Sequence, residues 1–161
     1  MYQKVFIVFK IYNIIFYLLD KHFTIRPIIY QNNEYKLQIW DTANDVNTNK
    51  IHKEFFVGTK GVFLIYDITN LDSFKNIKNY NKQVDENIPG SFKILIGYNC
   101  QKENRAVSSE EGKKLANELK IDSFFELPSN NDERIDEMLN VILAKKLFDN
   151  KNNENNNCLI I

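Results

Sequence analysis

The chain has 161 residues, 43% of them hydrophobic, which is enough for one domain with its own core. Its 21 Lys and Arg residues balance 21 Asp and Glu residues, so no charge attraction to nucleic acid is expected. The two cysteines, Cys100 and Cys158, are far apart in the sequence, which argues against a disulfide framework and favours a reducing compartment.

Two apolar runs open the chain. Lys4–Phe9 is rich in β-branched and aromatic residues and predicts a central strand, covered on both faces as in parallel sheets. Ile14–Leu19 predicts a short helix. Charged residues interrupt these runs too often for a membrane span, and no signal-peptide cleavage site follows. We therefore expect both segments to belong to the folded domain.

The next two segments predict a β-hairpin. His22–Tyr30 and Glu34–Asp41 are strand-like, and the Asn-containing link over 31–33 suits a tight turn, because Asn tolerates the left-handed conformation. Pro27 has no backbone N–H to donate to a neighbouring strand. The first strand of the hairpin is therefore expected at an edge of the sheet.

The second strand of the hairpin ends in short polar residues. Within it, Leu37 and Ile39 are predicted to face the core, with Trp40 on the opposite, less buried face. After Trp40 the alternation stops and the chain continues with Asp41, Thr42, Ala43, Asn44 and Asp45. Such residues suit a loop at the carboxyl end of a strand, which is where open α/β sheets bind ligands.

The remainder of the domain alternates between apolar strands and amphipathic helices. The expected elements are a helix within 46–59 that stops at Gly58, a strand over Gly61–Asp67, a helix with Phe74, Ile77, Val84 and Ile88 on one face, a strand over Phe92–Gly97, a helix capped by Ser108 with Glu111, a strand over Ser123–Leu127, and a helix with Ile135, Met138, Leu139, Ile142 and Leu147. This alternation predicts a doubly wound α/β fold with a mostly parallel sheet.

The composition changes after residue 149. The segment 150–161 is rich in Asn, Lys and Glu, cannot bury apolar area, and is expected to be a flexible tether after a domain over 1–149. It ends in Cys158-Leu159-Ile160-Ile161, which matches the C-a-a-X prenylation signal. A single prenyl chain on Cys158 anchors only marginally, so we expect cycling between the cytoplasmic face of a membrane and the cytosol.

Three of these segments together resemble the Rab proteins of the Ras-like small GTPases. They are K-L-Q-I-W-D-T-A before the polar loop, Y-D-I-T followed by S-F after the strand over 61–67, and the C-a-a-X ending. The resemblance runs from about Phe23 to Leu147. It implies the Ras-like P-loop GTPase fold and a role in vesicle trafficking. The implied partners are protein effectors, prenylation factors and membrane-extraction factors.

The resemblance also implies an effector-facing surface. Phe23, Trp40 and Phe55 match the aromatic triad that Rab proteins present to effectors. An exposed group of aromatic side chains is often a binding surface. A second interpretation, a small apolar cluster between the hairpin and the following helix, stays open.

The nucleotide site of the family is altered in this sequence. No Gly precedes Gly58, so the phosphate loop G-x-x-x-x-G-K-[ST] is missing, and the segment before Phe23 leaves room for only a shortened first helix and no switch I. The family's W-D-T-A-G-Q ends here in Asn44 and Asp45, and the Asp45 charge would repel a γ-phosphate. The position of the guanine-reading Asp is Gln101, and the S-A-K loop is replaced by Pro128-Ser129-Asn130.

We therefore predict a pseudo-GTPase that serves as an interaction module, with no catalytic residue. Remnant nucleotide-binding positions are Asp41, Thr42, Ala43, Asn44, Asp45 and Asn99. A Mg²⁺ at Asp41 would lack the phosphate oxygens and hydroxyl that complete its octahedron, so no metal site is assigned beyond that remnant. One alternative is a divergent but active GTPase that binds GTP or GDP with magnesium. The other is a truncated or mis-spliced product that does not fold stably.

Overall fold

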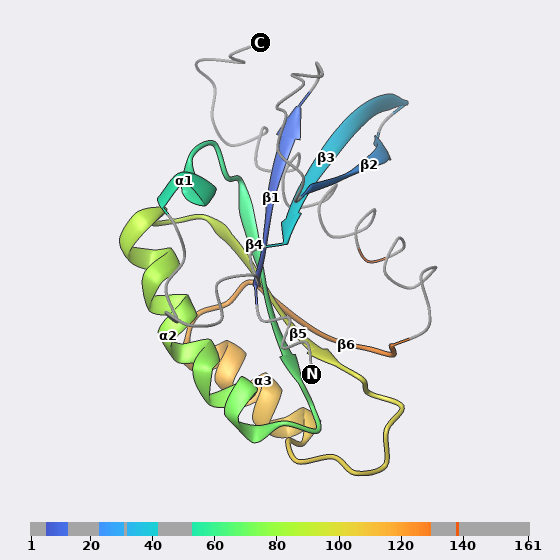
Figure 1. Cartoon of the computed structure of the whole chain (residues 1–161), viewed down its shortest axis with the longest axis vertical. Helices are drawn as coiled ribbons and strands as arrows, with labels where there is room; N and C mark the ends of the chain where they lie inside the picture. The colour runs from blue at the N-terminus through green and yellow to red at the C-terminus, as the bar shows by residue number, and fades with distance from the viewer. Residues whose placement is uncertain (1–5, 13–22, 31, 42–52, 130–137, 139–161) are drawn as a thin grey trace.

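The computed structural model describes residues 6–12, 23–30, 32–41, 53–129 and 138, which form a six-stranded sheet and its covering helices (Figure 1). In chain order the elements are β1 (Phe6–Tyr12), β2 (Phe23–Tyr30), β3 (Asn33–Asp41), α1 (Lys53–Phe56), β4 (Gly61–Asp67), α2 (Leu71–Asn87), β5 (Phe92–Tyr98), α3 (Ser109–Glu118) and β6 (Ser123–Leu127). The strand order across the sheet is β2-β3-β1-β4-β5-β6. This is the α/β architecture expected from the sequence.

The predicted hairpin is confirmed. β2 and β3 pair in antiparallel fashion, from Phe23 opposite Trp40 to Tyr30 opposite Asn33. Asn32 in the turn has φ 61°, the left-handed conformation for which Asn is suited. β2 lies at the edge of the sheet, as Pro27 predicts.

Four of the six strands run in one direction. β3 and β4 are each antiparallel to β1, and β4, β5 and β6 pair in parallel, so β3 to β6 share a direction that β1 and β2 oppose. The carboxyl ends of β3, β4, β5 and β6 therefore meet at one edge of the sheet, which we call the carboxyl edge.

The central position predicted for β1 is confirmed, but the parallel pairing expected of it is wrong. β1 starts beside the end of β3, where Ile7 pairs with Asp41, and ends beside the start of β3, where Tyr12 pairs with Lys36. A run that is apolar at successive positions fits a two-sided core in either direction, and antiparallel pairing is slightly more stable per residue. β1 thus ends on the side of the sheet opposite the carboxyl edge.

Two apolar clusters fill the two sides of the sheet. On the side of α2 and α3 (Figure 1), one cluster includes Trp40, Phe56, Val62, Leu64, Tyr66, Ile68, Ile77, Val84, Leu95 and Leu115. The second cluster, on the other side, includes Leu37, Phe63, Ile94, Ile96, Leu127 and Met138. Leu37 and Trp40 lie in different clusters, as the alternation predicts.

The expectation that only one face of β3 is buried is wrong. Gln38 is 6% exposed and Trp40 9% exposed, although both lie on the face opposite Leu37. The physical reason is that Trp40 packs in the same cluster as Phe56 of α1 and residues of α2. A sheet with apolar clusters on both sides buries both faces of its inner strands.

The helix ends follow the predicted signals. Ser108 and Glu111 form a capping box at the start of α3, with the Ser108 hydroxyl accepting from the Glu111 N–H. α2 ends at Asn87, just before Pro89-Gly90, and Gly90 takes φ 76°. Gly58, after the short α1, takes φ 72° and so supplies the conformation that a side chain would disfavour.

Several predicted features lie outside the described residues. They are the helix over 14–19, the loop over 42–45, the tether over 150–161 and most of the last helix. Of that last helix, Met138 is described, and it is helical and buried. Among the described residues, no helix has both the length and the apolar character that crossing a membrane requires.

Candidate functional site at the carboxyl edge

Polar residues gather where the parallel strands end. Asp67 closes β4, Tyr98 closes β5 and pairs with it, and Leu127 of β6 pairs with Tyr98. The loops that follow carry Thr69, Asn99, Gln101, Arg105 and Ser129. The carboxyl edge is the place where open α/β sheets hold ligands, so these loops form the candidate site.

The Asp67 carboxylate is bound from two sides. Its Oδ1 accepts from the Thr69 backbone N–H at 2.8 Å and from the Thr69 hydroxyl at 2.7 Å, and its Oδ2 accepts from Asn99 Nδ2 at 2.9 Å. Burial raises the pKa of this carboxyl, but the hydrogen bonds from Thr69 and Asn99 outweigh burial and leave the pKa below its usual value. The motif Y-D-I-T thus acts locally as an Asp-centred turn.

Asn99, predicted as a remnant of the nucleotide site, forms hydrogen bonds within the protein. It is 6% exposed and takes φ 69°, which directs its amide group to Asp67. Its backbone carbonyl accepts from the Lys102 N–H at 3.0 Å and closes the turn after β5. Its side-chain amide therefore connects the ends of β4 and β5.

Gln101 and Ser129 bind each other across the ends of β5 and β6. The Ser129 backbone N–H donates to Gln101 Oε1 at 3.1 Å, and Gln101 Nε2 donates to the Ser129 hydroxyl oxygen. The Tyr98 hydroxyl donates to the Ser129 carbonyl at 3.3 Å. The positions that resemble the guanine-reading Asp and the S-A-K loop are thus in direct contact.

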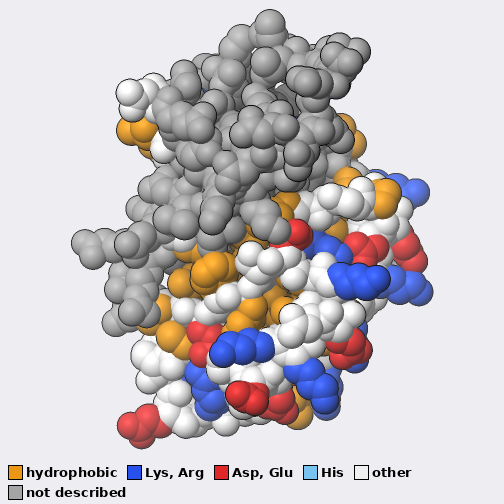
Figure 2. Space-filling view, turned by 180° about the vertical axis from the view of Figure 1, so that it is seen from behind, with side chains coloured by type: hydrophobic (Ala, Val, Ile, Leu, Met, Phe, Trp, Pro, Cys, Tyr) orange, Lys and Arg blue, Asp and Glu red, His pale blue; other side chains and the backbone are white. Residues whose placement is uncertain are grey.

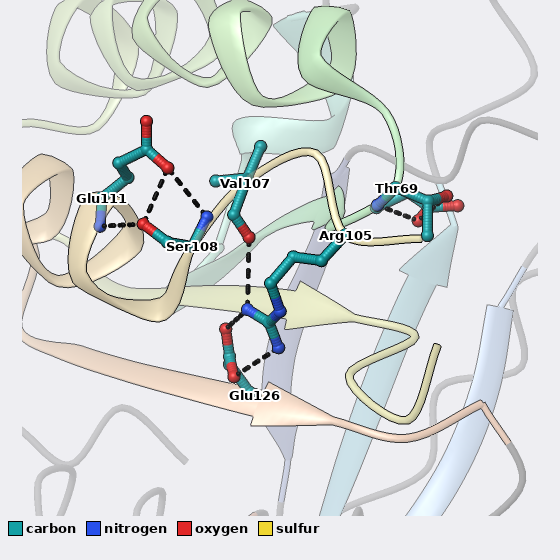
Figure 3. Close-up of polar contacts among 7 residues, drawn as sticks. Thr69, Arg105, Val107, Ser108, Glu111 and Glu126 are labelled. Carbon is teal, nitrogen blue, oxygen red and sulfur yellow. Dashed lines mark hydrogen bonds and ion pairs between the residues drawn. The ribbon is translucent and has the colours of Figure 1, made fainter. Parts of the chain in front are cut away.

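An ion pair also joins the loop after β5 to β6. Arg105 meets Glu126 of β6 through two hydrogen bonds, Nη1 to Oε1 at 2.7 Å and Nη2 to Oε2 at 3.1 Å, and Nη1 also donates to the Val107 carbonyl at 3.2 Å (Figure 3). Hydrogen bonding to Glu126 raises the pKa of the Arg105 guanidinium, which remains charged. The pair fixes the loop between β5 and α3 to β6.

Tyr66 lies under this part of the edge. Its ring contacts Phe74 with centroids 4.9 Å apart, and its side chain is fully buried. Within the described part of the chain its hydroxyl has no hydrogen-bond partner. Burial raises the pKa of this phenol, so it stays neutral. Tyr66 therefore belongs to the core beneath the carboxyl edge.

The predicted effector triad is only partly described. Phe23 is the cross-strand partner of Trp40, and Phe55 lies in α1 next to Phe56, which shares a cluster with Trp40. The three backbone positions therefore converge on one end of the hairpin. Trp40 itself is 9% exposed and belongs to the main core.

The remaining predicted site residues are placed only in part. Asp41 is the last residue of β3, and Thr42, Ala43, Asn44, Asp45 and Cys158 lie outside the described residues. Within the described ranges, no group of three or more His, Cys, Asp or Glu side chains is arranged to hold a metal ion. The described polar side chains at the carboxyl edge are hydrogen-bonded chiefly to one another.

Sequence reasoning missed several residues of this edge. The ion pair of Arg105 with Glu126 joins residues 21 positions apart, and no sequence motif predicts it. The role of Thr69 as a double donor to Asp67 was available from the motif, because a hydroxyl two residues after an Asp suits a local turn.

Known proteins resemble most of this chain. A sequence profile of the Ras family matches residues 17–148, a range that starts after β1. Ras-related protein Rab-13 of Rattus norvegicus is 37% identical over 117 residues, which is 71% of this chain and 57% of that protein. Ras-related protein SEC4 is 34% identical over 134 residues in Candida albicans and 32% over 133 residues in Saccharomyces cerevisiae, each 80% of this chain. The chain spans 57% to 63% of the length of these relatives.

Proposed function

This chain belongs to the Ras family as a Rab-type small GTPase homologue, and we propose that it works as a pseudo-GTPase, a prenylated interaction module of vesicle trafficking. The observation that carries the proposal is the direction of β1. A phosphate loop binds phosphate when it follows a strand at the carboxyl edge and opens a helix there. β1 ends at Tyr12 beside Lys36, at the opposite edge.

The sequence around β1 supports the same conclusion. The segment that follows Tyr12 has no Gly to take positive φ or to let backbone amides close on a phosphate, and the next Gly is Gly58. The family profile begins at residue 17, so β1 lies before the matched region. These features support the proposal that this chain does not bind phosphate through the family's phosphate loop.

Hydrolysis and base recognition are affected as well. Asp45 stands where the family places the water-orienting Gln, and its negative charge would oppose a γ-phosphate. Gln101, at the position of the guanine-reading Asp, already binds Ser129. We propose that the protein neither hydrolyses GTP nor depends on GTP, GDP or magnesium. Among the remnant positions Asp41, Thr42, Ala43, Asn44, Asp45 and Asn99, Asn99 then has a structural role, because its amide donates to Asp67.

Protein partners are proposed to bind at the hairpin and α1. Exposed apolar side chains lie on β2 and just after α1, the elements that carry the triad positions Phe23 and Phe55. They are Ile25 (44% exposed) and Ile29 (74%) on β2 and Val57 (71%) after α1. Apolar area of this kind marks an interaction surface, and Trp40 would support it from beneath. Charges of both signs are interspersed on the described surface visible in Figure 2, which suits a protein partner better than nucleic acid.

Membrane attachment is proposed to use a prenyl group on Cys158. The C-a-a-X ending follows a polar tract, and an apolar last residue, Ile161, resembles the geranylgeranyl class. One chain gives reversible binding, so the protein would cycle between the cytoplasmic face of a membrane and the cytosol with prenylation and membrane-extraction factors as partners.

Calorimetric titration of the folded protein with GTP and Mg²⁺ tests the loss of nucleotide binding. We expect no heat of binding in a sample whose cooperative thermal unfolding shows that it is folded. Stoichiometric binding would instead establish a divergent, nucleotide-binding GTPase. Absence of cooperative unfolding would indicate a truncated or mis-spliced product, and would also contradict the proposal.

Substitution of Cys158 by Ser tests the proposed lipid anchor. We expect the wild-type chain, expressed in eukaryotic cells, to divide between membrane and cytosolic fractions, and Cys158→Ser to be almost wholly cytosolic. Cys100→Ser is the matched control, because it removes the chain's other thiol from the folded domain. Equal membrane fractions for wild type and Cys158→Ser would exclude the anchor.

A further inference from the structure

The ends of β5 and β6 are joined by a contact that uses both halves of one side-chain amide. Gln101 accepts from the Ser129 backbone N–H through Oε1 and donates to the Ser129 hydroxyl through Nε2. Resting on the proposed function, we propose that this Gln101–Ser129 bridge is a built-in substitute for a bound base, which holds the two loops of the carboxyl edge together without any ligand.

The chemistry of Gln101 suits this role. A carboxamide has a donor and an acceptor side by side, and Ser129 offers a backbone N–H donor and a hydroxyl acceptor. An ionised Asp, the residue that the family resemblance places here, has acceptors only and a shorter side chain, so it could not form the donor half of the bridge. Gln101 also removes the negative charge that a guanine-reading Asp would carry.

Neighbouring contacts hold both loops in register for the bridge. The Cys100 N–H donates to the Leu127 carbonyl at 3.2 Å and extends the pairing of β5 with β6 by one step. The Tyr98 hydroxyl donates to the Ser129 carbonyl at 3.3 Å. Ser129 is therefore bound at its N–H, its hydroxyl and its carbonyl.

The other side of the loop after β5 is fixed as well. Asn99 is buried and bound to Asp67, and Arg105 binds Glu126 through two hydrogen bonds. Gln101 lies between these two fixed points and is itself exposed. An exposed hydrogen bond competes with water, so the bridge depends on this pre-alignment of its partners.

Amide hydrogen exchange of the full chain, monitored by NMR, tests the bridge at the Ser129 backbone N–H. In nucleotide-free wild type, the Ser129 amide should be protected, and Gln101→Ala should speed its exchange about tenfold, since two modest hydrogen bonds are lost. The Cys100 amide, bound to Leu127, should keep its protection and so reports that the fold is intact.

Two further variants sharpen the test. Lys102→Ala changes the adjacent exposed residue and should leave exchange at Ser129 unchanged. Gln101→Asn keeps the amide but is one methylene shorter, and should behave like Gln101→Ala because it cannot reach Ser129. An unprotected Ser129 amide in wild type, or equal exchange in wild type and Gln101→Ala, would overturn the bridge.

The same samples separate this inference from the proposed function. GTP binding to a wild-type protein whose Ser129 amide passes the exchange test would contradict the loss of nucleotide binding and leave the bridge standing. An unprotected Ser129 amide in a protein that binds no nucleotide would remove the bridge and leave the proposed function standing.

Discussion

Asp67 makes hydrogen bonds to several parts of the carboxyl edge. Its carboxylate accepts hydrogen bonds from Thr69 and Asn99, and its backbone N–H donates to the Ser73 hydroxyl at 3.0 Å. The Ser73 hydroxyl lies within hydrogen-bond distance of the Asn70 carbonyl, at 2.7 Å. The Y-D-I-T and S-F segments that carry the family resemblance thus connect the end of β4 to the start of α2 through hydrogen bonds.

Replacement of Asp67 by Asn should give a pH-dependent loss of stability. The folded pKa of Asp67 is lowered, so its ionised form stabilises the fold above the unfolded pKa, and that contribution disappears as the pH falls below about 4. We expect Asp67→Asn to lower the free energy of unfolding by about 1–2 kcal/mol at pH 7, because the Asn99 hydrogen bond loses its acceptor.

Urea denaturation of both proteins between pH 7 and pH 3 measures this effect. The difference between wild type and Asp67→Asn should narrow as the pH falls below the unfolded pKa of the carboxyl, because the unfolded wild-type chain then binds a proton that the folded chain binds less readily. A difference that stayed constant over the whole range would show that the charge of Asp67 does not matter.

Gly112 is required by close packing. A Cβ at this position would lie 2.5 Å from the Tyr66 hydroxyl oxygen and 2.7 Å from Phe124 Cε2. Gly112→Ala should therefore lower the free energy of unfolding by about 1–2 kcal/mol despite the better helix propensity of Ala. Tyr66→Phe in the same chain should recover part of that loss, because it removes the nearest atom. Thermal unfolding of the single and double variants checks both, and no recovery would mean that Phe124 alone sets the limit.

At the scale of elements, the helix start of α3 can be tested separately from its packing. The Ser108 hydroxyl accepts from the Glu111 N–H at 3.2 Å, and the Glu111 carboxylate accepts from the Ser108 N–H at 2.8 Å. Hydrogen bonds donated to the Glu111 carboxylate by the Ser108 backbone N–H and by the Ser108 hydroxyl lower the pKa of Glu111. The box therefore satisfies two backbone donors that the helix itself leaves free.

Ser108→Ala should lower the free energy of unfolding by about 1 kcal/mol, the usual cost of losing an N-cap. Ser109→Ala is the matched control, because Ser109 is the first residue of α3 and does not cap it. Chemical denaturation of the two variants is the measurement. Equal effects would show that the capping box is not what stabilises this helix end.

The elements also show what the sequence could predict. β4 and β6 have the predicted bounds, and α3 begins at the predicted Ser108 cap, because apolar periodicity and capping residues are local signals. The direction of β1 and the burial of Trp40 were not predicted. Strand direction depends on the neighbouring strands, and burial depends on the elements that pack on the sheet. The residues of the strand itself specify neither.

At the scale of the whole molecule, the candidate site was predictable only in its location. The strand ends and the altered positions Gln101 and Asn99 were visible in the sequence. The Gln101–Ser129 contact was not, because it joins residues 28 positions apart in two loops. The sequence shows that a residue of the family motif has been replaced. Which residue the substitute side chain contacts depends on the tertiary structure.

A pseudo-GTPase of this kind should form the described carboxyl edge without a nucleotide. The side chains of this edge form hydrogen bonds with one another, for example Asn99 with Asp67 and Arg105 with Glu126. We therefore expect the protein to be stable in the absence of guanine nucleotide and magnesium, unlike a protein whose fold is linked to a bound ligand.

The nucleotide content of the purified, folded protein is the most direct test. The protein would be denatured with acid and the released small molecules separated by chromatography, alongside thermal unfolding of the native sample with and without EDTA. For a pseudo-GTPase we expect no guanine nucleotide and the same melting temperature in both conditions. Stoichiometric GDP or GTP, with a melting temperature that falls when magnesium is removed, would contradict this expectation.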